Sequence, residues 1–379
     1  MSSWREYKLE DLADIYNHVR VPLSAMERAQ KQGQYPYYGA SGIIDYVDEY
    51  LFDGEYVLIS EDGENLKSRK TPIAFKAYGQ FWVNNHAHII QGKKPFLNDL
   101  IVYYFKNLDL NPYITGAVQP KLNKANLLEI PFDLPESEEE QKAIAEVLGS
   151  LDDKIDLLHR QNKTFEELAQ TLFRQWFIEE AKEEWEEKPL KDICEIINGF
   201  AFKSGDYREN GRTIIRTMNF KNGFINNSDV VYIDIQEEVK YTKYQLQKND
   251  FLLVMVGASL GNFAIVTNDI LPALQNQNMW NFRTLGNVSQ HYLNFAMRQI
   301  VEENISSASG SAREFFQKGQ FYQFMITVPD NETMQLFNDN IEDFYSKIEN
   351  NRLQIQTLEN LRDTLLPKLL SGEVKIKDK

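Results

Sequence analysis

The sequence predicts an α+β protein built twice: two similar globular domains, each followed by a long helix, with the two helices antiparallel in a coiled coil. The first observation is that residues 164–172 (TFEELAQTL) return as residues 357–365 (TLENLRDTL), 193 residues later. The second is that residues 4–12 (WREYKLEDL) return as residues 185–193 (WEEKPLKDI), 181 residues later. The third is a heptad pattern of apolar residues after each domain. A repeat this long exceeds a solenoid unit and indicates duplication of a domain with its helix.

The duplication sets the expected domain boundaries at residues 1–135 and 185–330 for the globular domains, and at 136–184 and 331–379 for the helices with their tail. Pro135 and Pro329 precede the two helices. Ser137, followed by three glutamates, predicts a capped helix start with negative charge at its N-terminal end. Ser371 and Gly372 predict the C-terminal stop of the second helix.

Each globular domain is expected to mix short strands with short helices. Apolar runs at residues 56–60, 73–77 and 251–256 predict strands. The pairs Asp53-Gly54, Asp62-Gly63 and Asn222-Gly223 predict turns. Residues 96–106 and 290–303 predict helices. We therefore expect twisted, partly antiparallel sheets in both domains.

The long helices carry apolar residues at heptad spacing, which predicts a coiled coil of about 36–40 residues, or roughly 55–60 Å. The two helices match position by position at the 193-residue shift. The expected seam of the first helix is Ile144, Leu148, Leu151, Ile155, Leu158, Asn162 and Phe165. The expected seam of the second helix is Phe337, Ile341, Phe344, Ile348, Asn351, Ile355 and Leu358.

Two asparagines, Asn162 and Asn351, occupy seam positions. Either a long seam simply tolerates them, or they fix the register, because an unpaired buried amide costs about 1–3 kcal/mol. The helix pair is interpreted as a spacer within one chain, with a dimerisation coiled coil between chains as the alternative.

Composition limits the class of protein. An apolar fraction of 42% with 12% aromatic residues supports folded cores. Cys194 is the only cysteine, so no disulfide can form within the chain, and a reducing compartment is expected. No signal-peptide pattern opens the chain, and the run at residues 251–256 is too short to span a bilayer. We expect a cytoplasmic protein with no membrane partner.

The net charge of −15 at first argues against a nucleic-acid partner. The acidic excess is concentrated in residues 138–188, however, and small basic clusters occur elsewhere. The relevant field is local, within a Debye length of roughly 8–10 Å, so such clusters can still bind phosphates. We expect weak non-specific DNA binding, with a basic partner supplying further backbone contacts.

The order of domain, helix, domain, helix resembles the specificity subunit of a type I restriction–modification system, over essentially the whole chain. Residues 37–43 (YYGASGI) with 53–63 (DGEYVLISEDG) resemble the family's recognition-domain signature, as do residues 198–207 (NGFAFKSGDY). Pro135 with Gln141 resembles the family's helix start. In the second copy Pro329 and Gln335 match, but Met334 replaces Glu140.

The resemblance implies that each globular domain recognises one half of a split target in double-stranded DNA and that the helices set the gap between the halves. It implies two modification (methyltransferase) subunits and motor–nuclease restriction subunits as partners. S-adenosylmethionine would belong to the methyltransferase, so no cofactor is expected in this chain.

No catalytic pattern is found in the sequence, and we expect a non-catalytic subunit. Asn111-Pro112-Tyr113 lacks one proline of a methyltransferase loop and is interpreted as a turn. Glycine-rich nucleotide motifs are absent from the sequence. His86-Ala87-His88 has no cysteine or carboxylate pattern that completes a zinc site and is interpreted as structural or groove-lining.

Residues that could contact DNA are polar or basic and lie in turn-rich segments. They are expected to act as clusters, and a solvated surface charge is the alternative for any one of them. In the first domain they are Lys67, Arg69, Lys70, Gln119, Lys121 and Lys124. In the second domain they are Arg212, Arg216, Asn219, Lys221, Arg313 and Lys318.

The alternative function is a non-enzymatic coiled-coil scaffold with two domains that bind protein or glycan. The acidic net charge is its best support, and such a scaffold would show no dependence on DNA sequence. A DNA-recognition subunit is favoured because the repeat, the helices and the local motifs agree.

Overall fold

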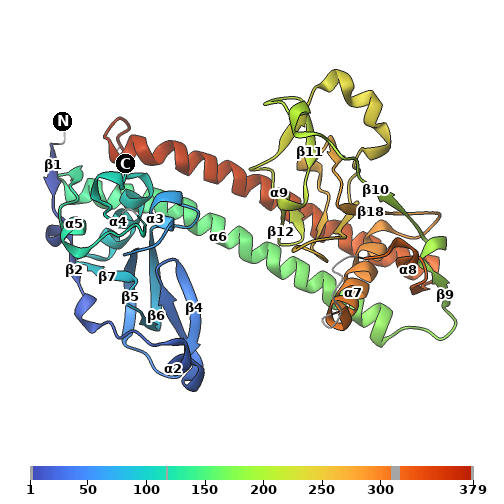
Figure 1. Cartoon of the computed structure of the whole chain (residues 1–379), viewed down its shortest axis with the longest axis horizontal. Helices are drawn as coiled ribbons and strands as arrows, with labels where there is room; N and C mark the ends of the chain where they lie inside the picture. The colour runs from blue at the N-terminus through green and yellow to red at the C-terminus, as the bar shows by residue number, and fades with distance from the viewer. Residues whose placement is uncertain (1–2, 117, 309–315, 377–379) are drawn as a thin grey trace. The chain divides into compact units, whose positions relative to one another are not determined.

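The computed structural model describes residues 3–116, 118–308 and 316–376. The chain divides into two compact units, Met1–Asp156 with Gln356–Lys379 (unit 1) and Leu157–Ile355 (unit 2). Each unit therefore contains one globular domain and a segment of both long helices, α6 (Glu138–Arg174) and α9 (Asn331–Leu370) (Figure 1).

Unit 1 is built on a six-stranded sheet with the order β2-β7-β5-β6-β3-β4 and a two-stranded sheet, β1-β8. Its strands are β1 (Trp4–Tyr7), β2 (Ala13–Ile15), β3 (Gln32–Gly39), β4 (Gly42–Val47), β5 (Phe52–Ser60), β6 (Ala74–Val83), β7 (Ala87–Gly92) and β8 (Phe132–Pro135). Its shorter helices are α1 (Leu9–Leu12), η1 (Asn17–Val19), α2 (Ala25–Gln30), α3 (Asn65–Ser68), α4 (Pro95–Asn107), η2 (Asn111–Tyr113) and α5 (Lys124–Leu128). The main core joins this sheet to α4 and to the segments of α6 and α9 that belong to the unit.

Unit 2 has a six-stranded sheet, β10-β18-β15-β16-β13-β12, a three-stranded sheet, β14-β11-β17, and the pair β19-β9. Its strands are β9 (Glu186–Pro189), β10 (Cys194–Asn198), β11 (Arg212–Ile215), β12 (Phe220–Lys221), β13 (Phe224–Ile225), β14 (Val231–Ile233), β15 (Phe251–Val254), β16 (Phe263–Ile265), β17 (Ala273–Gln275), β18 (Met279–Thr284) and β19 (Met325–Val328). Its shorter helices are η3 (Gln175–Glu179), η4 (Leu190–Asp192), η5 (Ser204–Asp206), η6 (Thr217–Asn219), η7 (Ile235–Tyr244), η8 (Asn268–Ile270), α7 (Gln290–Ala308) and α8 (Lys318–Phe321).

The two units share the main strand pairings, although β11 and its neighbours form a separate sheet in unit 2 while β3 and β4 belong to the main sheet of unit 1. In unit 1, β5 is antiparallel to both β6 and β7, and β3 is parallel to β6 and antiparallel to β4. In unit 2, β15 is antiparallel to β16 and β18, and β11 is parallel to β17 and antiparallel to β14. The strands that close each domain onto its helix, β1 with β8 and β9 with β19, also pair antiparallel. The duplication in the sequence is therefore a duplication of the fold.

The expected local signals have mixed outcomes. The Ser137 hydroxyl accepts from the Glu140 N–H at 3.3 Å, so it caps α6. Asn222 and Gly223 both have positive φ and connect β12 to β13, as a tight hairpin turn requires. The turn expected at Asp53-Gly54 is wrong. Both residues lie inside β5, where Asp53 pairs with Gln80 and Gly54 pairs with Gly79 of β6. Gly54 adopts a φ of +131°, and the strand continues through it.

The two helices are antiparallel within each unit. In unit 1 the beginning of α6 and the end of α9 share one core, which includes Ile144, Leu148 and Leu369. In unit 2 the end of α6 packs against the beginning of α9, through Phe173 with Phe337. The expected seam residues are buried, except for Leu151, Asn162, Phe165, Phe344 and Leu358, which are half-buried.

The two seam asparagines meet in unit 2. Asn351 is buried, and its side-chain N–H donates to the Asn162 Oδ1 at 2.9 Å. A slip of one helix by a turn would leave the Asn351 amide without this partner, at a cost of about 1–3 kcal/mol. This pairing supports a role in fixing the helix register.

Candidate nucleic-acid interface

Three loops of unit 1 are joined by backbone hydrogen bonds into what we call the loop frame: residues 61–63 after β5, residues 84–86 between β6 and β7, and residues 115–122. The Asn84 N–H donates to the Tyr38 carbonyl at 3.0 Å. The Glu61 N–H donates to the His86 carbonyl at 2.9 Å, and the Leu122 N–H donates to the Glu61 carbonyl at 2.8 Å. Main-chain bonds thus connect the three loops to one another and to β3.

Unit 2 contains the same loop frame. The Asn276 N–H donates to the Ile215 carbonyl at 3.1 Å, the Met255 N–H to the Asn278 carbonyl at 3.2 Å, and the Phe316 N–H to the Met255 carbonyl at 3.0 Å. These three bonds connect the same positions as the three bonds of unit 1. Residues 255–257 therefore correspond to residues 61–63, and residues 276–278 correspond to residues 84–86. The two units thus share the backbone of the loop frame but carry different side chains on it. Two domains that present different surfaces on one scaffold need this combination.

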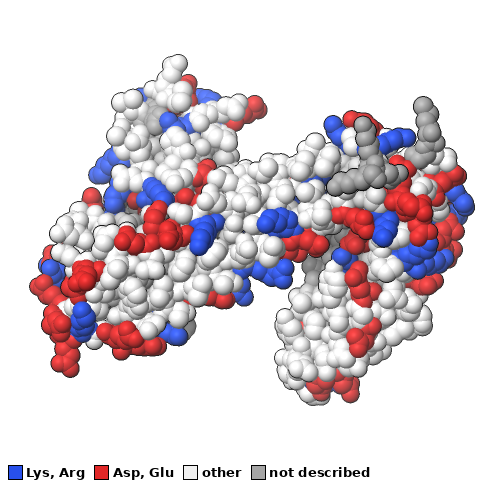
Figure 2. All heavy atoms as spheres, turned by 180° about the vertical axis from the view of Figure 1, so that it is seen from behind, with Lys and Arg blue, Asp and Glu red and all other residues white. Residues whose placement is uncertain are grey.

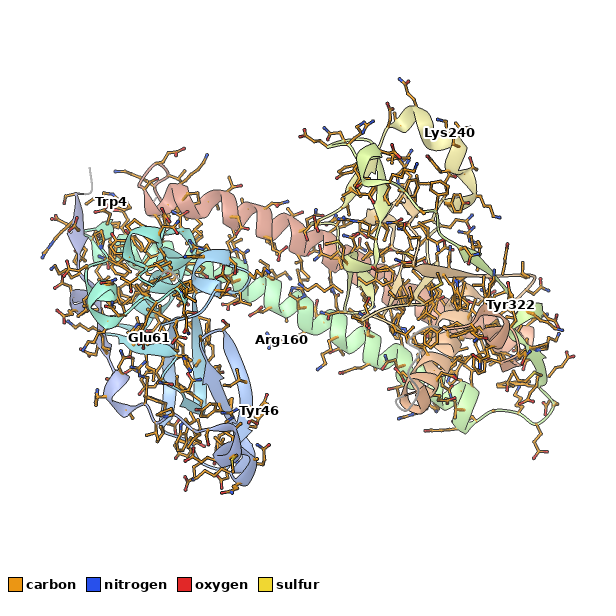
Figure 3. All side chains as sticks on the ribbon, viewed as in Figure 1. Trp4, Tyr46, Glu61, Arg160, Lys240 and Tyr322 are labelled. Carbon is orange, nitrogen blue, oxygen red and sulfur yellow. The ribbon has the colours of Figure 1, made fainter. Side chains whose placement is uncertain are left out.

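A buried carboxylate organises the loop frame of unit 1. Glu61 is 9% exposed and pairs with the Arg20 Nη1 at 2.6 Å and the Lys121 Nζ at 3.2 Å. Burial opposes its ionisation, but the hydrogen bonds from Arg20 and Lys121 hold the pKa of Glu61 below its usual value. Figure 3 labels Glu61 among the strands of unit 1. This carboxylate, which follows β5, joins Arg20 at the end of η1 to the 115–122 loop.

The two histidines of the His-x-His pattern have different surroundings. His88 is fully buried, with Nε2 2.7 Å from the Leu122 carbonyl and Nδ1 2.8 Å from the Asn17 amide. A carbonyl can only accept, so Nε2 carries the hydrogen and Nδ1 accepts from Asn17. Burial lowers the pKa of His88. His88 is therefore a neutral structural residue.

His86 lies at the surface of the same loop frame. Its side chain is 47% exposed, and Nδ1 lies 2.9 and 2.8 Å from the two carboxylate oxygens of Asp62. The Asp62 carboxylate fixes the ring, and Nε2 has no partner among the described residues.

The basic cluster expected at residues 67–70 is divided by the structure. Lys67 and Lys70 are exposed and have no partner among the described residues. Arg69 requires a correction, because its guanidinium donates to the Phe105 and Leu108 carbonyls, both at 2.5 Å. These are unpaired carbonyls at the C-terminal end of α4, so Arg69 caps that helix.

The second expected cluster of unit 1 borders the loop frame. Lys121 pairs with Glu61, and the Pro120 carbonyl accepts from the Gly63 N–H at 3.0 Å. Gln119 and Lys124 are exposed. The structure therefore brings Gln119 and Lys121 beside the Asp62-Gly63 turn, from which α3 and Lys67 continue.

In unit 2 the structure assigns backbone contacts to most of the expected residues. Asn219 is 2% exposed and donates to the Asp229 carbonyl at 2.8 Å, so its candidacy for base contact is corrected to a structural role. Arg216 donates to the same carbonyl at 2.8 Å, and Arg212 donates to the Pro272 carbonyl at 3.2 Å. Lys221 is exposed at the end of β12.

The two remaining candidates of unit 2 also differ from expectation. The Lys318 ammonium donates to the Ile196 carbonyl and lies 5.5 Å from the centre of the Tyr322 ring, so this lysine is corrected to a structural role. Arg313 lies outside the described residues.

The sequence pointed to the loop frame without identifying its surface residues. Aligning residues 84–87 (NNHA) with 276–279 (NQNM) gives the equivalence that the hydrogen bonds of both units show. The preference for basic residues left out Asp62 and Asn278, whereas His86 was expected to be structural or groove-lining. The signal available in the sequence was that His86 and Asn278, both polar, occupy equivalent positions in the aligned segments.

Charge in unit 1 is unevenly distributed. Seen from behind, the lobe built by α2, β3 and β4 is mostly uncharged and has acidic residues at its tip, whereas basic and acidic side chains are intermixed over the rest of unit 1 (Figure 2). The lobe carries exposed Glu27, Asp48 and Glu49. A polyanion is therefore disfavoured at the lobe tip.

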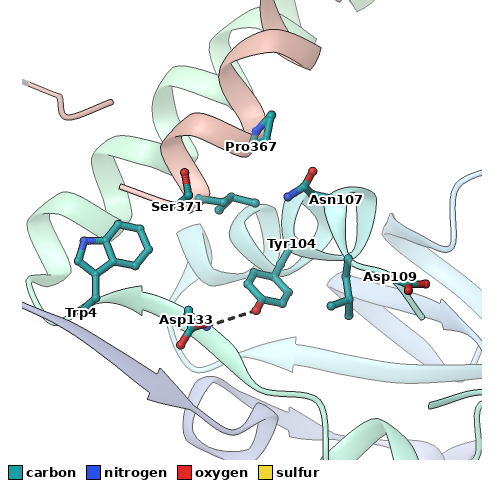
Figure 4. A pocket seen from close by; sticks show the side chains of 9 residues that line it. Trp4, Tyr104, Asn107, Asp109, Asp133, Pro367 and Ser371 are labelled. Carbon is teal, nitrogen blue, oxygen red and sulfur yellow. Dashed lines mark hydrogen bonds between the residues drawn. The ribbon is translucent and has the colours of Figure 1, made fainter. Parts of the chain in front are cut away.

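A cavity of about 510 Å³ lies elsewhere in unit 1, where β1, β8, α4 and the end of α9 meet. Trp4, Tyr104 and Ser371 line it, together with the carboxylates of Asp109 and Asp133 (Figure 4). Its acidic lining does not suit a phosphate. Among the described residues, no cluster of three or more histidine, cysteine or acidic side chains could hold a metal ion, and no helix has the length and apolarity needed to cross a membrane.

Comparisons with known proteins place this architecture. A family model described as "Type I restriction modification DNA specificity domain" matches residues 1–167 and 182–360. The MjaIX type I restriction enzyme specificity subunit of Methanocaldococcus jannaschii is 24% identical over 417 aligned residues, covering 99% of this chain and 94% of that protein.

A further relative and a solved structure add to these matches. A type I restriction enzyme specificity subunit of Haemophilus influenzae is 39% identical over 127 residues, so the match spans 34% of this chain and about a third (32%) of that relative. The crystal structure of a type I restriction–modification S subunit from M. genitalium has the same fold, with a TM-score of 0.65 at 15% identity, covering 100% of this chain and 97% of the other.

Proposed function

The chain belongs to the family of type I restriction modification DNA specificity domains, and we propose that it gives a type I restriction–modification complex its DNA sequence specificity. Each unit would recognise one half of a split target in double-stranded DNA, and α6 with α9 would set the unspecified gap. The chain would contribute recognition and assembly but no catalytic step.

One observation carries this proposal: the loop frame occurs twice with the same backbone bonds and different side chains. A protein that reads two half-sites of different sequence needs one support for each half-site and different polar groups on each support. A scaffold with two protein- or glycan-binding domains does not account for the family match. We therefore favour the DNA-recognition function over that alternative.

The proposed partners are two modification subunits, which would hold S-adenosylmethionine, and restriction subunits with motor and nuclease activities. The repeated helix motif supports two copies of one partner. Leu168 in α6 and Leu361 in α9 occupy equivalent positions at the 193-residue shift, and both are 45% exposed. Two equivalent exposed leucines provide two similar apolar contacts, one in each helix.

The proposal is tested by co-expressing the chain with its methyltransferase partner and sequencing N6-methyladenine across the host DNA. We expect a split motif with one fixed gap that disappears when this chain is deleted. A stable complex that methylates no split motif would contradict the proposal and favour the scaffold.

We further predict that Leu168→Ala and Leu361→Ala each weaken binding of one methyltransferase copy about tenfold or more, since a buried leucine contributes about 1.5–3 kcal/mol relative to an exposed one. Native mass spectrometry of the complex would then show one bound copy where the unchanged chain binds two. Leu157→Ala is the control, because Leu157 is 40% exposed on α6 but its counterpart in α9 is Asn350. Unchanged stoichiometry in both variants would exclude this pair of contacts.

A further inference from the structure

We infer that His86 and Asn278 are specificity-determining residues, each contacting a base of the half-site that its unit recognises, and that Asp62 is the positioning residue for His86. The inference rests on the proposed function and deepens it. It starts from the equivalence of the two loop frames, in which the His86 and Asn278 carbonyls accept the equivalent N–H of Glu61 and Met255.

The backbone of both residues is held by the frame while their side chains are available. The His86 carbonyl is occupied by Glu61, and its side chain is 47% exposed. Asn278 is exposed, and its amide has no partner among the described residues. A side chain on a fixed main chain loses little entropy when it meets a ligand, which favours discrimination between similar ligands.

The chemistry of His86 follows from Asp62. A carboxylate can only accept, so in its neutral form the His86 ring donates through Nδ1 and presents the Nε2 lone pair outward. An outward acceptor suits the exocyclic amino group of adenine or cytosine in the major groove. The cations that approach phosphates lie close by in the chain, since Lys67 and Lys70 follow the Asp62-Gly63 turn.

The chemistry of unit 2 differs at each equivalent position. Asn278 offers a donor and an acceptor, the pair that reads adenine through N6 and N7. Val256 replaces Asp62 in the frame and is 39% exposed, so it can contact an apolar group such as the thymine methyl but cannot orient a histidine. The two half-sites are therefore expected to differ at the bases that His86 and Asn278 contact.

The test uses the complete complex with its methyltransferase and maps N6-methyladenine for His86→Asn and Asn278→Gly. Glycine suits the φ of +69° at position 278, so this variant removes the side chain without backbone strain. We expect His86→Asn to change or relax one base of one half-site, and Asn278→Gly to relax one base of the other. The gap and the opposite half-site stay unchanged in both variants.

Asp62→Asn separates positioning from direct contact. An amide accepts or donates, so His86 can then take either tautomer, and we expect the preference at the His86 base to fall about tenfold while the complex still assembles. His159→Asn is the control, because His159 is an exposed histidine of α6 and should leave the motif unchanged.

The outcomes are distinguishable. A wild-type complex without a split motif refutes the proposed function itself. A wild-type motif that both His86→Asn and Asn278→Gly leave unaltered refutes the inference alone. If a variant abolishes methylation, its affinity is measured for a set of DNA duplexes in which each half-site position carries each of the four bases in turn. Weakening that depends on one base supports the inference, and uniform weakening overturns it.

Discussion

Glu61→Ala should lower the free energy of unfolding of unit 1 by about 2–3 kcal/mol. The substitution leaves the Arg20 guanidinium, whose side chain is 16% exposed, without its carboxylate. The expected loss of stability is at the lower end of what breaking a buried ion pair costs, because the other partner of Glu61, Lys121, is half-exposed and can be hydrated. Urea unfolding with hydrogen exchange of the β5 and β7 amides measures it.

The same substitution should change the pH dependence of stability. The pKa of Glu61 is lowered in the folded protein, so its contribution is fully present above the unfolded value of about 4.5 and is lost as the pH falls through the folded value. The difference in stability between wild type and variant should therefore shrink on acidification below about pH 4.5. Glu64→Ala is the control, since Glu64 is exposed, and a difference that is constant from pH 7 to pH 3 would exclude this mechanism.

Gly199→Ala should destabilise unit 2 by about 3 kcal/mol, at the upper end for overpacking. A Cβ at Gly199 would lie 1.8 Å from the Asn276 carbonyl oxygen and 2.5 Å from its carbon. Both atoms belong to the main chain of the loop frame. The residue after Gly199, Phe200, donates its N–H to the carbonyl of Gln275 at the end of β17, at 3.1 Å, which holds the two segments together. The frame must therefore move, and recognition by unit 2 should weaken along with stability.

Gly205→Ala is a matched control in the same segment. Nothing lies within 4 Å of a Cβ at Gly205, so the substitution should change stability by less than about 0.5 kcal/mol. Thermal unfolding and DNA binding of the two variants, each in complex with the methyltransferase, provide the comparison. Equal behaviour of Gly199→Ala and Gly205→Ala would show that the close approach at Gly199 is tolerated.

The sequence predicted the architecture well because its signals are local or periodic. A heptad seam and a repeat at a constant shift are properties of the chain alone, so the two helices and the two similar domains could be recognised without coordinates. The turn at Asn222-Gly223 followed in the same way from two residues. The turn expected at Asp53-Gly54 was wrong, because pairing with β6 decides whether glycine ends a strand or bends it.

The prediction of surface residues was less successful, for a reason that is visible at Arg69 and Lys318. A basic side chain in a turn-rich segment is available to DNA only if no unpaired carbonyl lies within its reach, and the carbonyls that bind these two residues come from α4 and β10. Their positions depend on chain segments 36 and 122 residues away. No local pattern contains that information.

By itself, the sequence determined that the chain is duplicated and that each copy ends in a long amphipathic helix. Only the tertiary structure decided that His88 is buried while His86 faces outward, and that Gly199 must remain without a side chain. Those properties arise where loops that are distant in the sequence approach one another, and the local pattern of residues does not report which loops will meet.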